Sequence, residues 1–359
     1  MSTNRTDIDL LFDCDKWDLL QQSIKYVIFT TSRSWGGIME LNGVEVMLKL
    51  SAYTRWVTLD PKNIPEGAEH PVSTEIEMLK AIRQKIIERN YSPAFIEIIY
   101  AKDCEVTPIQ HARSPYTRFE GSSNNDFLRR LSPDVTKMAL IVLEKCNMTF
   151  RKFVTRMVFA RDIAIFKSVL FMLIHGWHVL HLAIPDFRHG DTHTENFMVK
   201  MDAAAGFCGT PRVNIVYALG KTYAVPYYSV IPKVIDFDHS RSESLGIVTY
   251  TANMAQVNMY TNELARLFHG LKWRLMKVYG QNEFSKLAME LIYSLTPQEA
   301  YVSDANVTNA TFPTTDELLG SKTFEEYKIA DTILIPEEVT KVLPEGTVIS
   351  HIYSPVIYD

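Results

Sequence analysis

An apolar stretch at residues 163–184, near the middle of the 359-residue chain, constrains the fold more than any other feature. It contains four ionisable side chains, namely Lys167, His175, His178 and His181. Because charged groups are costly inside a membrane, a helix buried in a protein core explains the stretch better than a membrane span does. The chain is long enough for two domains or for one large fold with two lobes.

The composition is that of an ordinary globular protein. Hydrophobic residues make up 47% of the chain and charged residues 22%, so we expect a sizeable core and no membrane partner. The 37 basic and 42 acidic residues give a net charge of −5, which argues against a nucleic-acid partner. No apolar signal-peptide run opens the sequence. Widely spaced cysteines without a CxxC pattern predict free thiols in a reducing compartment: Cys14, Cys104, Cys146 and Cys208.

A short polar run follows the apolar stretch, from Arg188 to Asn196, and leads into Phe197-Met198-Val199. Asp191 precedes Asn196 by five residues, a spacing that lets both side chains face one small volume from a tight loop. The carboxylate can accept the proton of a hydroxyl group, and the amide oxygen can bind a divalent metal. The run therefore predicts a tight loop that brings an acid and a metal-binding amide together.

Two strand-like segments occupy the N-terminal part, at residues 24–29 and 43–50, with residues 38–41 between them. In the second segment, Lys49 lies on the opposite face from the apolar residues, so it would point into a cleft. The connection at residues 31–37 is rich in small residues whose backbone N–H groups could bind phosphate: Ser32, Ser34, Gly36 and Gly37. A solvated lysine and an ordinary hairpin turn are the alternatives.

A helix is predicted to start near residues 71–74. Its periodicity places Glu75 on the same face as Leu79 and Ile82, whereas Glu77 falls on a polar face beside Lys80. A buried carboxylate needs a partner. We therefore predict that Glu75 faces the core and has a partner there, the alternative being two exposed acids at a helix start.

The remaining chain alternates between predicted regular elements and insertions. We expect an N-terminal helix at 8–22, a strand at 95–101, a long loop at 106–137, a strand at 138–146, helices at 150–159 and 162–184, a hairpin around Gly220, a strand ending in Asp236-Phe237-Asp238, helices near 260–268, 283–295 and 314–328, and an extended tail at 331–359.

In this order, the motifs resemble those of protein kinases: a degraded glycine-rich loop, a V-A-I-K-like strand, an H-R-D-x-x-x-x-N-like loop and a D-F-G-like turn. The sequence from about 24 to 330 is similar to protein kinase-like proteins of nucleocytoplasmic large DNA viruses, most specifically at residues 189–193, 223–227 and 231–237. The resemblance implies an α+β, bilobal kinase-like fold. Its parts would be an extension at 1–23, a small β-rich N-lobe with one helix C at 24–143, a larger helical C-lobe at 144–330 with a hairpin insertion at 201–232, and a tail.

The resemblance also implies a role for each motif residue. Lys49 would contact the α- and β-phosphates of ATP and be held by Glu75, and Asp191 would orient the acceptor hydroxyl and take its proton. Asn196 and Asp236 would bind Mg²⁺ or Mn²⁺. His189 would tie the loop to Phe237, and His193 would contact the γ-phosphate. The adenine pocket would be lined by Met47, the gatekeeper Leu143 and the backbone of Glu144 to Cys146.

The implied function is a viral serine/threonine kinase that phosphorylates a protein substrate in the host cytoplasm or in the virion. The sequence departs from the kinase pattern at Met47, at Asp238 in place of glycine, at His193 in place of lysine, and in lacking A-P-E. The H-G-D-x-H-x-x-N loop also resembles aminoglycoside and choline kinases, so a small-molecule kinase is one alternative and a pseudokinase scaffold another. Zinc binding by His175, His178, His181, His189 and His193 is a further alternative, as is phosphorylation of Ser240, Ser242 or Ser244.

Overall fold

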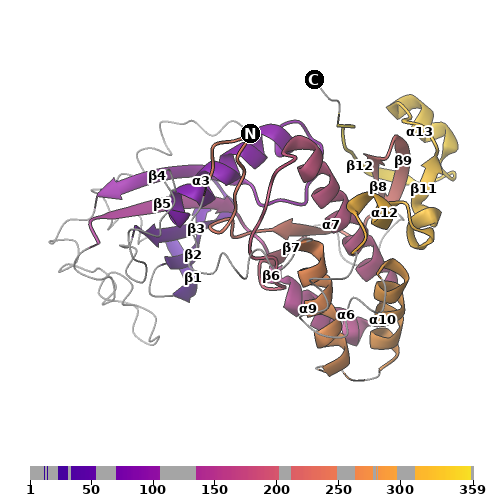
Figure 1. The fold of residues 1–359 in the computed structure, drawn as a ribbon, viewed down its shortest axis with the longest axis horizontal. Coiled ribbons are helices and arrows are strands. Elements are labelled where there is room, and N and C mark those ends of the chain that lie inside the picture. The colour runs from indigo at the N-terminus through magenta and orange to yellow at the C-terminus, as the bar shows by residue number, and fades with distance from the viewer. Residues whose placement is uncertain are drawn as a thin grey trace. The chain divides into compact units, whose positions relative to one another are not determined.

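The computed structural model describes residues 12, 14, 23–30, 34–53, 70–105, 135–201, 212–248, 263–277, 280, 282–296 and 312–356 (Figure 1). The chain is a mixture of helices and strands, as the sequence predicts. It divides into two compact units. The first contains Met1–Lys80, Glu97–Lys145 and Val248–Ala252, and the second contains Ala81–Ile96, Cys146–Ile247 and Asn253–Asp359.

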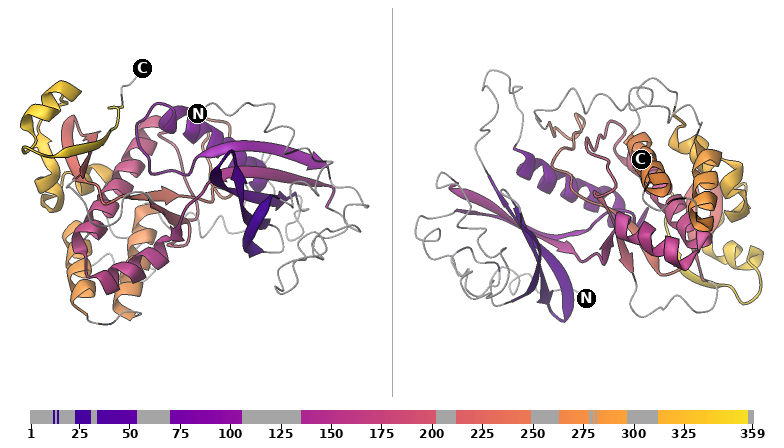
Figure 2. Two further views of the ribbon diagram at one scale, coloured as in Figure 1. Left: turned by 180° about the vertical axis from the view of Figure 1, so that it is seen from behind. Right: turned by 90° about the horizontal axis from the view of Figure 1, so that it is seen from below.

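The first unit is built on a five-stranded antiparallel sheet in the order β1-β2-β3-β5-β4, whose strands are labelled in Figure 1. Figure 2 shows the same strands, in indigo and purple, from two further sides. The strands are β1 (Ile24–Thr30), β2 (Ser34–Leu41), β3 (Val44–Ala52), β4 (Ile98–Glu105) and β5 (Lys137–Glu144). Helix α3 (Pro71–Ile82) follows β3 in the chain and continues as a π-helical turn at Arg83–Ile87. In the described part of this unit α3 is the one helix, and the pair of Lys49 with Glu75 joins it to the sheet.

Strand β3 alternates as its sequence predicts. Val46, Leu48 and Leu50 are at most 2% exposed and belong to the apolar core of the unit, whereas Met47 and Lys49 on the other face are half-buried. The strand lies between β2 and β5 in the sheet. The central position therefore gives Lys49 a fixed direction, because a one-residue shift of register would exchange the two faces.

Strand β2 begins at Ser34, inside the connection predicted at 31–37, and this changes the interpretation of the small residues. Ser34, Gly36 and Gly37 lie in the strand, where Gly36 pairs with Lys49, so the expected connection at 31–37 is wrong for these three; Ser32 lies outside the described residues. A Cβ on Gly37 would lie 2.5 Å from the buried indole of Trp35. This glycine therefore makes room for a core side chain.

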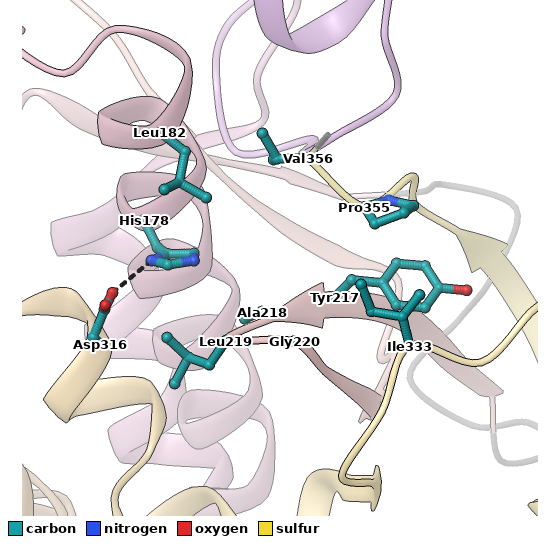
Figure 3. A pocket seen from close by; sticks show the side chains of 10 residues that line it. All are labelled: His178, Leu182, Tyr217, Ala218, Leu219, Gly220, Asp316, Ile333, Pro355 and Val356. Carbon is teal, nitrogen blue, oxygen red and sulfur yellow. Dashed lines mark ion pairs between the residues drawn. The ribbon is translucent and has the colours of Figure 1, made fainter. Parts of the chain in front are cut away.

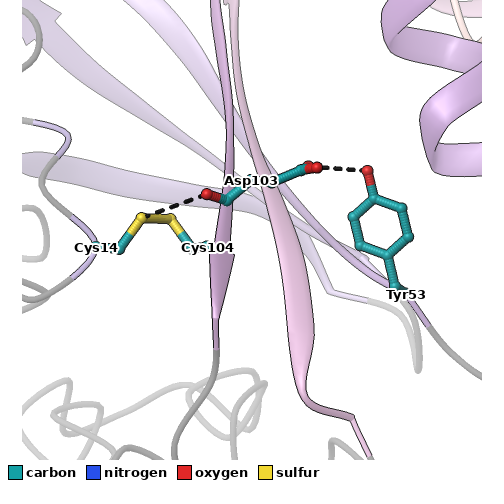
Figure 4. Close-up of a disulfide and its surroundings, with 4 residues drawn as sticks. All are labelled: Cys14, Tyr53, Asp103 and Cys104. Carbon is teal, nitrogen blue, oxygen red and sulfur yellow. Dashed lines mark hydrogen bonds between the residues drawn. A yellow bond between two sulfur atoms is a disulfide. The ribbon is translucent and has the colours of Figure 1, made fainter.

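A disulfide joins Cys14 to Cys104, so the predicted free thiols are wrong for these two cysteines (Figure 4). The bond fastens a segment before β1 to strand β4, next to Phe12, whose ring stacks on Tyr100 at 5.3 Å. Cys146 keeps a buried thiol, as predicted, and Cys208 lies outside the described residues. The two bonded cysteines are 90 residues apart, so spacing along the sequence gives no indication that folding brings them together.

The second unit is organised around helix α7 (Ile163–Ala183). By length and composition α7 could cross a membrane, but 83% of its most apolar window is buried inside the protein, which agrees with the predicted core helix. Asp162 caps the helix by accepting hydrogen bonds from the amides of Ala164 and Ile165. The other helices are α6 (Phe150–Ala160), α9 (Glu263–Lys277) and α10 (Glu283–Leu295), and a three-stranded sheet contains β6 (Met148–Thr149), β7 (Phe197–Met201) and β10 (Val230–Val234).

The predicted hairpin is present as β8 (Arg212–Ala218) and β9 (Lys221–Pro226), and it belongs to a four-stranded sheet, β11-β9-β8-β12 (Figure 1). Residues 331–359, expected as an extended tail, contain helix α13 (Pro336–Val342) and strand β12 (Val348–Ile352), which pairs in parallel with β8. The sheet is completed by β11 (Lys328–Ala330), which follows α12 (Thr315–Leu319) and a 3₁₀ helix at Lys322–Tyr327. The hairpin and the C-terminal segment therefore fold together.

One predicted strand lies at a different position, and two other predicted segments fall outside the described residues. The strand predicted at 95–101 starts at Ile98, and Phe95 instead forms an isolated bridge with Val234 in the second unit. The predicted loop at 106–137 lies almost wholly outside the described residues, as does the predicted helix at 8–22.

Candidate active site

His189 anchors the loop that connects α7 to β7. Its ring is fully buried, Nε2 lies 3.0 Å from the carbonyl oxygen of Ile235, and the Asp191 amide lies 3.4 Å from Nδ1. A carbonyl can only accept, so Nε2 carries the proton and Nδ1 accepts. Burial lowers the pKa of His189, which keeps the ring neutral. Its centroid lies 5.0 Å from that of Phe237, the contact that the kinase resemblance implies.

Glu263, the first residue of α9, holds the same loop from the other side. Its carboxylate accepts hydrogen bonds from the amides of His189 (2.9 Å) and Gly190 (2.6 Å), and its carbonyl oxygen accepts one from the Thr192 hydroxyl (2.7 Å). Gly190 has a φ of +80°, and a Cβ there would lie 2.5 Å from the carbonyl oxygen of His239. The backbone path therefore requires glycine at the position where the kinase motif has arginine.

Asp191 accepts three side-chain hydrogen bonds. Oδ1 accepts from Nη1 of Arg266 at 2.7 Å, and Oδ2 accepts from Nε2 of His193 at 3.2 Å and from Nδ2 of Asn196 at 3.0 Å. Burial would raise the pKa of Asp191, but the hydrogen bond from His193 and the charge of Arg266 hold it well below its usual range. Asp191 is therefore ionised throughout the physiological range and can accept a hydrogen bond from a hydroxyl group.

Asn196 and Asp236 have the chemistry of a magnesium site. Nδ2 of Asn196 donates to the main-chain oxygen of Asp191 at 2.9 Å as well as to Oδ2, which turns the amide oxygen away from that carboxylate. The Ile235 amide donates to the Asn196 carbonyl at 3.0 Å and so brings the D-F-G-like turn to the loop. Asp236 itself has a φ of +66°, an uncommon conformation that tends to occur at functional sites.

This pair fits Mg²⁺ because that ion is commonly held by one or two protein oxygens together with substrate phosphates. No cluster of three or more His, Cys, Asp or Glu side chains suited to a metal occurs in the described part of the chain, so the zinc alternative gains no support. Of its proposed ligands, His175 is buried and His181 half-buried on α7, and burial lowers the pKa of each to about 4.

In the first unit, Lys49 and Glu75 form the predicted ion pair. Nζ lies 2.7 and 2.8 Å from the two carboxylate oxygens, and the side chains are only 12% and 3% exposed. Glu77 pairs with Lys80 instead, at 2.8 Å, with both side chains about half exposed. Helical periodicity therefore distinguished the buried acid from the solvated one two residues later.

The predicted adenine-binding residues are only partly placed as expected. Leu143 is 4% exposed and pairs with Met47 across β3 and β5. The Glu144 amide donates to the carbonyl oxygen of Glu97 at 2.9 Å, and its carboxylate accepts from the Glu97 amide, so this amide is not directed at a nucleotide. Cys146 is buried.

Two of the three candidate phosphorylation sites are inaccessible. Ser240 and Ser242 are fully buried, and they donate hydrogen bonds to the His189 carbonyl and to Asp186 respectively. Ser244 is exposed, and both its hydroxyl and its amide bond to Asp186. Only Ser244 could therefore be modified without unfolding the turn.

Glu263 and Arg266 are functional candidates that the sequence motifs did not identify. They lie three residues apart on α9, in a segment predicted only as a core helix, and Arg274 on the same helix bonds to Thr194 and Glu195 of the loop. The signal that identified Glu75, an acid on an apolar helix face, also applies to Glu263. Arg266 has no such signal, because its partner is brought to it by the tertiary fold.

The second unit also contains a pocket of about 210 Å³, shown in Figure 3. It lies beside α7, the β8–β9 turn and the C-terminal segment, and His178 at its edge bonds to Asp316 at 2.8 Å. Ligand sites usually occupy about 300–1,000 Å³. The pocket is smaller, so the catalytic-type loop remains the better candidate site.

No family model matches the chain, and no curated protein sequence is similar to it. Among solved structures, that of WaaP in complex with acyl carrier protein is similar with a TM-score of 0.35 and 12% sequence identity. The similarity covers 80% of this chain and 85% of that chain. The chemical interpretation therefore depends on the geometry of the residues described above.

Proposed function

We propose that the chain is an ATP- and Mg²⁺-dependent phosphotransferase with a kinase-like fold. The observation that carries the proposal is the meeting of Asp191 and Asn196, whose side chains bond at 3.0 Å on a loop fixed by His189 and Glu263. The loop presents an ionised carboxylate beside an amide oxygen that can bind metal. These are the two groups that a phosphate acceptor and Mg²⁺ need.

The strongly lowered pKa of Asp191 defines its role. A carboxylate this acidic is a weak base, so Asp191 would orient the acceptor hydroxyl and receive its proton only once the new phosphate bond is largely formed. This is sufficient for phosphoryl transfer through a loose transition state, in which the protein does little covalent chemistry and mainly positions the reactants. Lys49, held by Glu75, would bind the α- and β-phosphates, and Asn196 and Asp236 would hold Mg²⁺, which neutralises phosphate charge when bound.

We further propose a serine or threonine of a protein as the acceptor, and a viral enzyme acting in the host cytoplasm or virion. This finer proposal is supported only by the resemblance of the motifs at residues 189–193, 223–227 and 231–237. A small-molecule acceptor is the second candidate, and one observation favours it. The backbone around Gly190 requires the H-G-D form of the loop, which is the form that aminoglycoside and choline kinases share.

A pseudokinase scaffold is the third candidate. The amide of Glu144 is used within the protein, and Ser34, Gly36 and Gly37 lie in a strand instead of a loop. Both features reduce the number of backbone donors that the motif comparison assigned to ATP. The enzyme is favoured by five charged or metal-binding side chains that the chain retains, namely Lys49, Glu75, Asp191, Asn196 and Asp236.

Thermal unfolding of the full chain with ATP separates these candidates. With Mg²⁺ present and ATP at 100 times its dissociation constant, we expect about 2.7 kcal/mol of added stability, and EDTA should remove most of it. Lys49→Ala should abolish the ATP effect, whereas Lys80→Ala, which removes an exposed lysine from a solvated pair, should keep it. Acceptor hydroxyls are then screened as a panel of proteins and of small alcohols. No Mg-ATP shift together with no phosphate transfer would eliminate the enzyme.

A further inference from the structure

We propose that Arg266 is a catalytic residue that binds the phosphoryl group during its transfer. The inference deepens the proposed phosphotransferase function and rests on it. The hydrogen bonds that Asp191 already makes restrict where an acceptor hydroxyl can bond to this carboxylate.

An ionised carboxylate offers about four lone-pair sites, two on each oxygen. Oδ2 of Asp191 accepts from both His193 and Asn196, which uses both of its sites. Oδ1 accepts one hydrogen bond from the described residues, from Arg266. An acceptor hydroxyl that bonds to Asp191 without displacing a loop residue must therefore bond to Oδ1, on the oxygen that Arg266 contacts at 2.7 Å.

The acceptor oxygen and the phosphoryl group that it attacks would then both lie near this guanidinium. An arginine side chain has five N–H donors in a planar fork, so it can bond a carboxylate and a phosphoryl oxygen together. Arg266 is suitably placed for this, because its side chain is 34% exposed while Glu263, one helical turn earlier, fixes α9 to the loop. An arginine also keeps its charge at every physiological pH.

His193 cannot supply that constant charge. It occupies the loop position where serine/threonine kinases carry a lysine, and its Nε2 donates to Oδ2 of Asp191 at 3.2 Å. Its Nδ1 accepts a hydrogen bond from the Glu195 amide at 3.2 Å, which requires a neutral ring. Both ring nitrogens are therefore used within the loop, so we assign the missing loop cation to Arg266 on α9.

The test uses the full-length protein with Mg-ADP and aluminium fluoride, which mimics a phosphoryl group in transfer. We expect aluminium fluoride to raise the unfolding temperature of the wild type above that with Mg-ADP alone. Arg266→Ala should lose this increment and keep the Mg-ADP effect, while Arg266→Lys should keep part of it. Arg274→Ala removes another contact between α9 and the loop without touching Asp191, and it should keep the whole increment.

Transfer kinetics provide the second measurement. Removing a donor to the transition state typically lowers kcat by about 10²–10³, so we expect that loss in Arg266→Ala with little change in the KM for ATP. A protein that only needed Arg266 for folding would lose Mg-ADP binding as well.

The inference is overturned if Arg266→Ala keeps the aluminium fluoride increment, if its kcat stays near that of the wild type, or if the wild type shows no increment. Failure of the underlying function looks different. In that case the wild type transfers no phosphate and is not stabilised by Mg-ATP, whatever residue occupies position 266.

Discussion

The ion pair of Lys49 and Glu75 offers the sharpest test of the fold that we propose positions the ATP phosphates. At a separation of 2.7 Å and an effective dielectric constant of 20, the Coulomb attraction is about 6 kcal/mol. The desolvation of two buried groups offsets most of it. Removing one partner is more costly than this balance suggests, because the other charge stays in a site that water barely reaches. We therefore predict that Lys49→Met lowers the free energy of unfolding by about 3–5 kcal/mol.

The assay is urea unfolding at pH 7.5, followed by tryptophan fluorescence and circular dichroism. Lys49→Met/Glu75→Leu, which replaces both charges by apolar groups, should recover most of the stability lost in the single variant. The control is the pair of Lys80 and Glu77 on the same helix, which is equally short but about half exposed. Its single variants should cost less than about 1 kcal/mol. Equal losses at the two pairs would refute the reasoning.

Three further predictions concern stability. Burial lowers the pKa of His175 to about 4 from 6.5. Below pH 6.5 the unfolded chain therefore binds more protons than the folded one, and the folded state loses stability as the pH falls towards 4, by about 2 kcal/mol at pH 5. His175→Gln should remove that part of the difference between urea titrations at pH 7.5 and pH 5. Gly190→Ala should destabilise the protein more than Gly220→Ala does, by roughly 2 kcal/mol or more. Both glycines have a positive φ, but only at Gly190 would an added Cβ meet a main-chain oxygen. Equal denaturation midpoints of the two variants would contradict the steric explanation. Cys104→Ser should lower the free energy of unfolding by about 2–5 kcal/mol, and dithiothreitol should destabilise the wild type and leave the variant unchanged.

Local periodicity predicted the parts of the site that depend on one element at a time. The two-residue repeat of β3 gave Lys49 its face, and the helical repeat of α3 selected Glu75 over Glu77. The apolar composition of α7 predicted its burial. Each of these outcomes follows from side-chain directions that the backbone conformation fixes, so a single sequence is sufficient to predict it.

Features that join distant segments were not predictable in the same way. Arg266 reaches Asp191 only because α9 packs on the loop, 75 residues further along the chain. The disulfide of Cys14 and Cys104 removes the thiol-based argument for a reducing compartment, which now stands as a proposal only. The C-terminal segment looked extended because a short strand such as β12 has little pattern of its own, and its partner β8 lies far earlier in the sequence.

The central claim is that Asp191 directs an acceptor hydroxyl to the γ-phosphate of ATP. The most direct test is the initial rate of phosphate transfer from Mg-ATP, to the chain itself or to the best acceptor in the panel, for the wild type and for Asp191→Asn. Asparagine keeps the size of the side chain and removes its charge, so we predict a rate lower by about 10²–10⁴ with Mg-ATP binding intact. Equal rates in the two proteins would contradict the claim.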